Sequence, residues 1–203
     1  GRAIRFPVPE VRVFNSRASQ GVRGIKLVNE GDEVVSMSVI KHFEAESYER
    51  QAYLKMRRAM AGLADDDELP AVEVGKVNAQ ISRVCFAEMS DAENLILTIT
   101  SKGAGKLSSS HDYPVRGRGG MGVQAFDKAM RGGPLVASFP VEMGDQIMLA
   151  TSTGQSIRVP VDGISFRSRS AGGVRIFNTG NGEEVVSVAW IADNGDEEEA
   201  VEE

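Results

Sequence analysis

Residues 145–191 read DQIMLATSTGQSIRVPVDGISFRSRSAGGVRIFNTGNGEEVVSVAWI, and residues 94–141 read NLILTITSKGAGKLSSSHDYPVRGRGGMGVQAFDKAMRGGPLVASFPV. Both stretches pass through the same order of features: an apolar run, a glycine turn, a short strand with a basic residue, a basic loop, a Gly-Val pair and a final apolar strand. Each unit of about 45 residues holds about four short strands with turn signals between them. Such units are typical of propeller blades, which bury their apolar faces by stacking on their neighbours.

A third copy of this unit opens the chain. Residues 1–40 match the other two copies from the turn onward, with Arg5 in the short strand and Val34–Ile40 as the final strand. The leading strand is missing, so we expect the chain to begin inside a repeat and to be part of a longer protein. The Gly-Val pairs, such as Gly21-Val22, fit strand entries, because glycine permits positive φ or close backbone approach and valine favours a strand.

The stretch 41–93 breaks the pattern, and we interpret it as an insertion between the first two repeats. Residues 44–62 predict a helix because they are rich in strong helix formers, lack proline and end on glycine. Ile81–Glu88 is interpreted as a strand that buries Cys85 as a small hydrophobe. The insertion is expected to pack on the edge of one blade, with a partner surface on the helix as the alternative. The predicted divisions are an incomplete first blade at 1–40, the insertion at 41–93, a second blade at 94–141, a third blade at 142–192 and a disordered acidic tail at 193–203.

Composition excludes several classes of protein. With 203 residues, 41% of them hydrophobic and 26% charged, the chain is globular rather than disordered. No apolar run approaches the roughly 20 residues of a membrane helix, so no membrane partner is expected. One cysteine excludes an intramolecular disulfide and a cysteine-based zinc site, and it fits a reducing cytoplasm. No Ser-His-Asp group or Walker loop is present, so we expect no active site in this chain.

Charge is distributed unevenly behind the net value of −6. The tail holds seven acids and no base, whereas the three repeats hold 16 basic and 11 acidic residues. Twelve of those 16 are arginine, whose planar fork donates two hydrogen bonds at once to a phosphate. The basic body therefore favours a polyanionic partner if its charges share one face.

The basic loops are the candidate binding elements. In Val115–Val123, Arg116 and Arg118 supply charge, and the glycines let backbone N–H groups approach a ligand. The same loop satisfies G-x-G-x-x-G, but a proline precedes it and a strand follows, so a dinucleotide site is not expected; a flexible surface loop is the alternative interpretation. Recurrence of such loops on one edge of successive blades would follow the phosphates of a bent duplex with little base readout. The candidate DNA-contacting residues are Arg12, Arg17, Arg23, Lys106, Arg116, Arg118, Arg158, Arg167, Arg169 and Arg175.

The aromatic residues fit a structural role. Trp190, Phe126, Phe139 and Phe177 are placed in strands and assigned to the core. Aromatic residues make up only 6% of the chain, which is low for single-strand binding by base stacking.

Several short stretches carry a resemblance to a known family. They are Gly21–Leu27, Gly31–Ser36, Asp145–Met148, Thr153-Gly154, Arg158 and Glu184–Val186. These repeats resemble the C-terminal domain of the A protein of bacterial DNA gyrase. Residues 116–122, RGRGGMG, also look like a variant of the family's QRRGGKG box, in a later blade and with Met121 in place of its lysine.

The resemblance implies a fold and a function. The fold is an all-β pinwheel, whose propeller-like blades of four strands exchange strands with their neighbours, here with a helical insertion. Six blades are usual, and this chain would supply roughly the last three. The basic rim of such a domain wraps double-stranded DNA, so that the holoenzyme, an ATP-dependent type IIA topoisomerase, introduces negative supercoils with ATP bound by gyrase B.

The resemblance also implies the partners. They are DNA, the rest of gyrase A and gyrase B in an A2B2 holoenzyme of the bacterial cytoplasm, associated with the chromosome. No cofactor is expected in this chain, because ATP and Mg are used elsewhere in the holoenzyme. The catalytic tyrosine lies in the N-terminal part of gyrase A, so none of Tyr48, Tyr53 and Tyr113 is expected to be it.

Two alternatives stay open at the level of sequence. One is the corresponding domain of topoisomerase IV, which bends DNA without strong wrapping; the acidic tail and the box-like loop favour gyrase. The other is a propeller-like scaffold for protein interactions that does not bind DNA. The salt dependence of DNA affinity separates the scaffold from the other two, because phosphate contacts release counterions.

Overall fold

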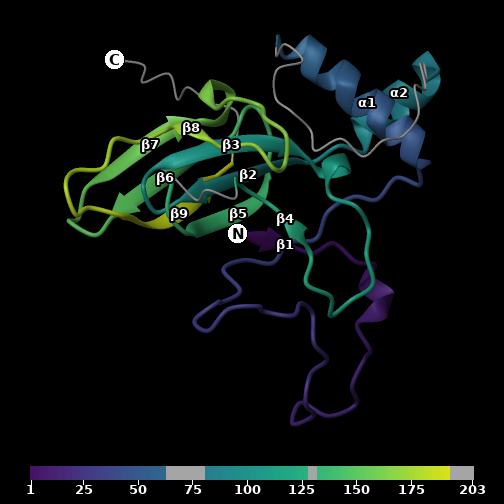
Figure 1. Ribbon diagram of the computed structural model, residues 1–203, viewed down its shortest axis with the longest axis horizontal. Coiled ribbons are helices and arrows are strands. Elements are labelled where there is room, and N and C mark those ends of the chain that lie inside the picture. Colours follow the sequence, from purple (N-terminus) through teal and green to yellow (C-terminus); the bar gives the residue numbers. More distant parts are fainter. Residues whose placement is uncertain (63–80, 128–131, 193–203) are drawn as a thin grey trace, which may run out of the picture.

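The computed structural model describes residues 1–62, 81–127 and 132–192, which form small antiparallel sheets and a pair of helices (Figure 1). The strands are β1 (Arg2–Ala3), β2 (Leu95–Thr100), β3 (Ala104–Ser109), β4 (Val123–Gln124), β5 (Leu135–Val141), β6 (Gln146–Thr151), β7 (Ser156–Pro160), β8 (Val174–Arg175) and β9 (Val185–Ile191). The helices are α1 (Ser47–Met60) and α2 (Arg83–Asp91), and the 3-10 turns are η1 (Val8–Glu10), η2 (Ser110–Asp112) and η3 (Val161–Gly163). The predicted disordered tail at 193–203 lies outside the described residues.

The second and third repeats each form an antiparallel sheet around their leading strand. β2 pairs with β3 and β5, and β6 pairs with β7 and β9. The tight turns that join β2 to β3 and β6 to β7 contain Gly103 (φ +75°) and Gly154 (φ +86°) in the left-handed region, which favours glycine. The predicted order of apolar run, glycine turn, short strand and final strand is therefore confirmed in both repeats.

Neighbouring repeats exchange strands. β8 of the third repeat joins the sheet of the second through β3, with Val174 opposite Gly105. β4 of the second repeat pairs in the same way with β1 of the first, with Val123 opposite Ala3. The second and third repeats thus each lend the strand after their basic loop to the repeat before them, which confirms the expected β-pinwheel.

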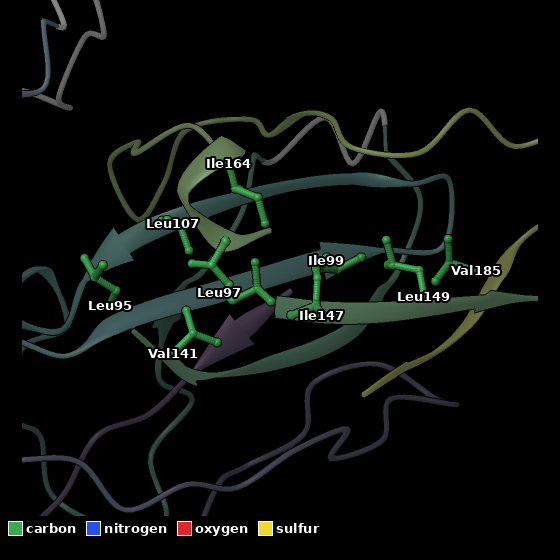
Figure 2. Packing of buried hydrophobic residues seen from close by; sticks show 10 residues of the cluster. Leu95, Leu97, Ile99, Leu107, Val141, Ile147, Leu149, Ile164 and Val185 are labelled. Carbon is green, nitrogen blue, oxygen red and sulfur yellow. The ribbon is translucent and has the colours of Figure 1, made fainter. Parts of the chain in front are cut away.

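The main core lies between the sheets of the second and third repeats. Leu97 and Ile99 of β2 and Ile147 and Leu149 of β6 are fully buried, and Figure 2 shows them meeting between the two sheets. Burial of side chains of this size stabilises a fold by about 1.5–3 kcal/mol each. Stacking therefore supplies the stability that a single blade cannot provide. The buried members of the cluster are Leu95, Leu97, Ile99, Leu107, Val141, Ile147, Leu149, Val161, Ile164 and Val185.

The insertion folds as two helices rather than as a helix and a strand. α1 lies within the predicted range 44–62, but the predicted strand Ile81–Glu88 is wrong because that segment forms most of α2. Ser82 caps α2 by accepting a hydrogen bond from the Cys85 backbone N–H (3.0 Å). Cys85 is accordingly half-buried in a helix and not enclosed in a strand. None of the described helices is both long enough and apolar enough to cross a bilayer.

The helix pair packs at one end of the sheets (Figure 1). The Tyr53 ring of α1 meets the His111 ring of η2 edge-on, with centroids 5.1 Å apart. The His111 Nε2 lies 2.8 Å from the Met89 carbonyl of α2 and donates to it. The Arg57 guanidinium lies 4.6 Å from the centroid of the Phe166 ring in the third repeat. The insertion therefore packs against the second repeat and reaches the third.

The final strand predicted for the first repeat does not form. Residues 34–40 belong to none of the described sheets, and Met37 is 89% exposed. In the other repeats this strand pairs with the leading strand of its own repeat, and residues 1–33 contain no counterpart of that strand. The segment is attached instead through the Ser36 hydroxyl, which donates to the Ser138 carbonyl (2.6 Å), and through Ile40, which packs against the cluster of Ile96, Tyr113 and Ala125.

The aromatic predictions hold only in part. Trp190 lies in β9 as predicted but is 56% exposed, and its indole N–H donates to the Asp145 carboxylate (2.7 Å). β9 is an outer strand of its sheet, and both Ala189 and Trp190 near its end are exposed. Phe126 is buried and Phe177 half-buried, but both lie in bends after β4 and β8 rather than in strands. Phe139 lies in β5 and packs against the main core, as predicted.

Candidate nucleic-acid interface

Three basic loops connect equivalent elements of the repeats. The first basic loop (11–20) follows η1, the second (113–121) follows η2 and the third (164–172) follows η3. The second and third loops end at the Gly-Val pairs that begin β4 and β8. A short turn on one side and an exchanged strand on the other therefore fix both ends of these two loops.

Glycine is needed at the end of each of these two loops because the preceding repeat lies very close. A Cβ at Gly122, whose φ is +67°, would lie 2.3 Å from the Ala3 carbonyl oxygen. A Cβ at Gly173 would lie 2.8 Å from the backbone of Gly105. The close backbone approach predicted for the Gly-Val pairs is thus confirmed at Gly122 and Gly173. It is wrong for Gly21, which has nothing within 4 Å of its Cβ position and precedes no strand.

Backbone hydrogen bonds join the second loop and the third loop each to the repeat before it, which links the repeats into one array. The Gly119 N–H of the second loop donates to the Gly24 carbonyl of the first repeat (2.7 Å). The Arg167 N–H of the third loop donates to the Leu107 carbonyl of the second repeat (2.7 Å). The basic loops of successive repeats are therefore held in sequence and in fixed register.

The structure separates the ten candidate residues by exposure. Six have exposed side chains: Arg12, Arg17, Arg23, Arg116, Arg158 and Arg175. Arg167 is half-buried. The Arg12 guanidinium lies 4.6 Å from the Phe14 ring centroid, which orients a cation on an otherwise open loop. Exposed guanidinium groups along a linked array are suited to phosphate contacts.

Lys106 does not belong to this exposed set. Its side chain is fully buried, and Nζ donates to the carbonyls of Ser168 (2.9 Å), Arg169 (2.6 Å) and Ala171 (2.6 Å) in the third loop. The ammonium also lies 4.8 Å from the Phe126 ring centroid. The prediction of Lys106 as a DNA contact is therefore corrected, because the side chain is engaged in holding the neighbouring loop.

Strand register explains this error. The structure forms equivalent parallel bridges at Arg5 with Val115 and at Leu107 with Phe166, so Arg5 corresponds to Leu107 and not to Lys106. A shift of one residue along a strand turns a side chain to the opposite face. Both faces of β3 are covered, because Lys106 and Leu107 are each buried, so the lysine does not reach the surface that the comparison of the repeats suggested.

Arg118 and Arg169 are also engaged within the protein. Both side chains are half-buried, and their guanidinium groups donate to backbone carbonyls of the preceding repeat. Arg116, two positions before Arg118 in the same loop, stays exposed. The arginines of one loop thus fall into two kinds, which sequence reasoning treated as one.

An open hollow of about 500 Å³ lies between the second and third repeats. Lys102 and Arg175 line it together with Asp127 and Thr179. Sequence reasoning missed Lys102, although its place beside the Gly103 turn in the second repeat was a usable signal. Lys102 is thus a second exposed cation that lines the same hollow as Arg175.

The buried tyrosines belong to packing. Tyr113 packs with Ile96 and Ala125 in a small second core. Burial raises the pKa of Tyr113 to about 12, and it raises the pKa of Tyr53 to about 12 as well. Both phenols therefore stay protonated at neutral pH.

A family model described as the DNA gyrase C-terminal domain, a β-propeller, matches residues 1–41, 94–133 and 145–189. The chain belongs to this family. The matched ranges include every candidate DNA-contacting residue and leave out the segment that carries α1 and α2.

Curated relatives of this gyrase C-terminal domain are whole gyrase A proteins. DNA gyrase A of Granulibacter bethesdensis is 41% identical over 99% of the chain and 23% of its own length. The gyrase A of Rickettsia bellii is 38% identical over 98% of the chain and 22% of its length. That of Haemophilus influenzae is 31% identical over 100% of the chain and 20% of its length. The chain thus spans about a fifth of the curated relatives it matches.

A solved gyrase A C-terminal domain also aligns with the chain. The alignment covers 49% of this chain and 34% of that structure, with 22% identity and a TM-score of 0.47. The pinwheel assignment therefore rests on the exchanged strands and the family match, not on this superposition.

Proposed function

We propose that this gyrase C-terminal domain binds and wraps duplex DNA as part of DNA gyrase A. The observation that carries the proposal is that exposed arginines recur in successive repeats linked by backbone hydrogen bonds: Arg12, Arg17 and Arg23 in the first, Arg116 in the second, and Arg158 and Arg175 in the third. Phosphates follow one another regularly along a duplex, so a curved row of cations matches the backbone of bent DNA. Because the contacts are to phosphate, binding is tolerant of sequence.

In the proposed holoenzyme the chemistry lies outside this chain. The chain acts with the rest of gyrase A, which carries the catalytic tyrosine, and with gyrase B, which binds ATP with Mg, in an A2B2 assembly on the bacterial chromosome. The work of this domain is to bend the duplex and present a second segment for passage. The curated relatives described above are gyrase proteins, which favours gyrase over topoisomerase IV.

The proposal is tested by replacing exposed arginines in full-length gyrase A. Arg116→Ala with Arg175→Ala should weaken binding to a duplex of about 100 base pairs at all sequences alike. The slope of log affinity against log salt should become shallower by about 0.9 for each phosphate contact that the substitutions remove. A nicked circular DNA that is resealed while the protein is bound reports the wrap as a change in linking number.

The matched control removes the same charge from the insertion. Lys55→Ala with Arg83→Ala changes two exposed cations on α1 and α2, which lie outside the basic loops. This pair should leave the salt slope and the linking change at the unsubstituted values. If both pairs changed the salt slope and the linking change equally, DNA binding would depend on net charge and not on the arginines of the repeats. If the unsubstituted protein did not bind DNA at low salt, the scaffold alternative would be favoured.

A further inference from the structure

Arg118 bridges both ends of the first basic loop. Its backbone N–H donates to Glu10 Oε2 (2.7 Å), and its Nε donates to the Glu10 carbonyl (2.9 Å). Its Nη1 donates to the Arg23 carbonyl (2.6 Å). Glu10 is the last residue of η1, and Arg23 directly follows the first Gly-Val pair. One side chain of the second repeat therefore clamps the start and the end of the loop before it.

Arg169 makes the same contacts one repeat later. Its backbone N–H donates to Asp112 Oδ2 (2.7 Å), its Nε donates to the Asp112 carbonyl (2.9 Å), and its Nη1 donates to the Gln124 carbonyl. Asp112 is the last residue of η2, and Gln124 directly follows the second Gly-Val pair. The bridge thus occurs twice, at the same position of the repeat and with the same atoms.

Cations of the earlier repeat hold the later loop in return. Arg2 of β1 donates from Nε to the Met121 carbonyl (2.7 Å) and from Nη2 to the Gly122 carbonyl (2.8 Å). Lys106 of β3 donates to three carbonyls of the third loop. Both described boundaries between repeats are therefore clamped in two directions by cation–carbonyl bonds.

The arginines of one loop have two different roles: some hold the preceding repeat, and others remain exposed. A guanidinium has five N–H donors, and Arg118 and Arg169 commit those of Nε and Nη1 to the backbone of the preceding repeat. Arg116 remains exposed and available to a ligand. A stiff duplex resists bending and pushes back on whatever bends it. An array that holds bent DNA must therefore resist rotation of its blades, which is the task that the bridging arginines fit.

On the basis of the proposed wrapping function, we propose that Arg118 and Arg169 are positioning residues. Each fixes the angle between successive blades and so sets how much DNA is wrapped, without contacting phosphate. Affinity comes from the exposed arginines, and curvature comes from the bridging ones.

The test compares three variants of full-length gyrase A. Arg169→Lys keeps the charge, but one ammonium cannot span the Asp112 and Gln124 carbonyls as the planar fork does. We expect the linking change per bound protein to fall by at least about two-fold, with an unchanged salt slope. Arg169→Ala should behave in the same way. Arg116→Ala, the comparison variant, removes an exposed arginine that makes no bridge, and it should instead make the salt slope shallower by about 0.9.

A second readout needs no DNA. The Leu107 N–H donates to Ser165 and the Arg167 N–H to Leu107 across the same blade boundary, so Arg169→Lys should speed their hydrogen exchange by about ten-fold or more. Unchanged exchange, or a shallower salt slope with the wrap intact, would overturn the positioning role. Failure of the wrapping function itself looks different, because the unsubstituted protein would then produce no linking change, and the curvature role would fall with it.

Discussion

A fully buried ammonium group is costly unless its charge is well compensated, and Lys106 meets that requirement with three carbonyl oxygens and an aromatic face. Those carbonyls belong to the third basic loop, whose irregular backbone has few partners in regular structure. The lysine thus supplies donors that a strand would otherwise provide. A residue that looks like a ligand-binding cation in the sequence acts as part of the scaffold.

Lys106→Met should therefore destabilise the domain. The methionine fills a similar volume but removes the ammonium that donates to three carbonyls, and we expect the free energy of unfolding to fall by about 3 kcal/mol. Arg158→Met is the control, because Arg158 is exposed on β7 and its replacement should cost less than about 0.5 kcal/mol. Urea denaturation of both variants checks this, and similar midpoints for the two would contradict the structural role of Lys106.

At the residue scale, the distance from the glycine turn shows that Lys106 and Arg158 occupy different positions of the repeat. Counting from the glycine turns at Gly103 and Gly154 aligns Lys106 with Ile157, an apolar strand position, and aligns Arg158 with Leu107. The recurrence of basic residues is real, but a difference of one residue reverses the face of a strand. By contrast, nothing in the spacing separates Arg116 from Arg118, because the bridging contacts depend on how two blades approach.

Among the elements, the insertion shows how a buried titratable group attaches a helix pair to a sheet. His111 of η2 faces the helices, where the Tyr53 ring meets it edge-on and the Met89 carbonyl accepts a hydrogen bond from its ring N–H. Burial lowers the pKa of His111 below the usual 6.5, and the charges of Arg5 and Arg50 lower the pKa further. The Met89 carbonyl and Glu93 oppose this shift without reversing it.

Acid should therefore weaken the fold through His111. Because its pKa is lower in the folded state, the unfolded chain binds the proton more readily, and stability is lost as the pH falls below about 6.5. His111→Gln keeps a donor for Met89 but does not titrate, so its unfolding midpoint in urea should change less between pH 7.5 and pH 5. An equal loss in both proteins would assign the acid sensitivity to other groups.

In the insertion, the sequence predicts the first helix correctly but predicts a strand where the second helix forms. The long run of helix formers before Gly62 was sufficient to predict α1. The segment from Ile81 resembled a strand because of its apolar and β-branched residues, and the capping serine at Ser82 was the signal that would have favoured a helix. Packing of Phe86 and Met89 against Tyr53 then favours the helix over a strand, and that contact joins residues far apart in the sequence.

For the whole molecule, the exchanged strands make the blades depend on one another. β4 reaches β1 only because Gly122 has no side chain at the point where the Ala3 carbonyl approaches. The repeat pattern predicted blades and their order, whereas the exchange itself came from the family resemblance. Short two-residue strands such as β1, β4 and β8 leave too weak a pattern to be read from one sequence.

Gly122→Ala should separate the first repeat from the second. The new Cβ would meet a carbonyl oxygen at 2.3 Å in a backbone region that disfavours alanine, so we expect a loss of about 2 kcal/mol or more. Gly117→Ala in the same loop is the control, because nothing lies within 4 Å of its Cβ position. Hydrogen exchange at Ala125, whose N–H donates to the Gly1 carbonyl, follows the boundary directly. Equal protection in the two variants would contradict the close approach.

The exchange of strands also sets an order of events during synthesis. The sheet of the second repeat ends with β8, which the ribosome makes only after it has made β6 and β7 of the next repeat. The second blade thus cannot be completed when its own residues have left the ribosome, and it carries an open edge until its successor arrives. The boundaries of the genetic repeat and of the folded unit are out of phase, so a deletion of one repeat would damage two sheets at once.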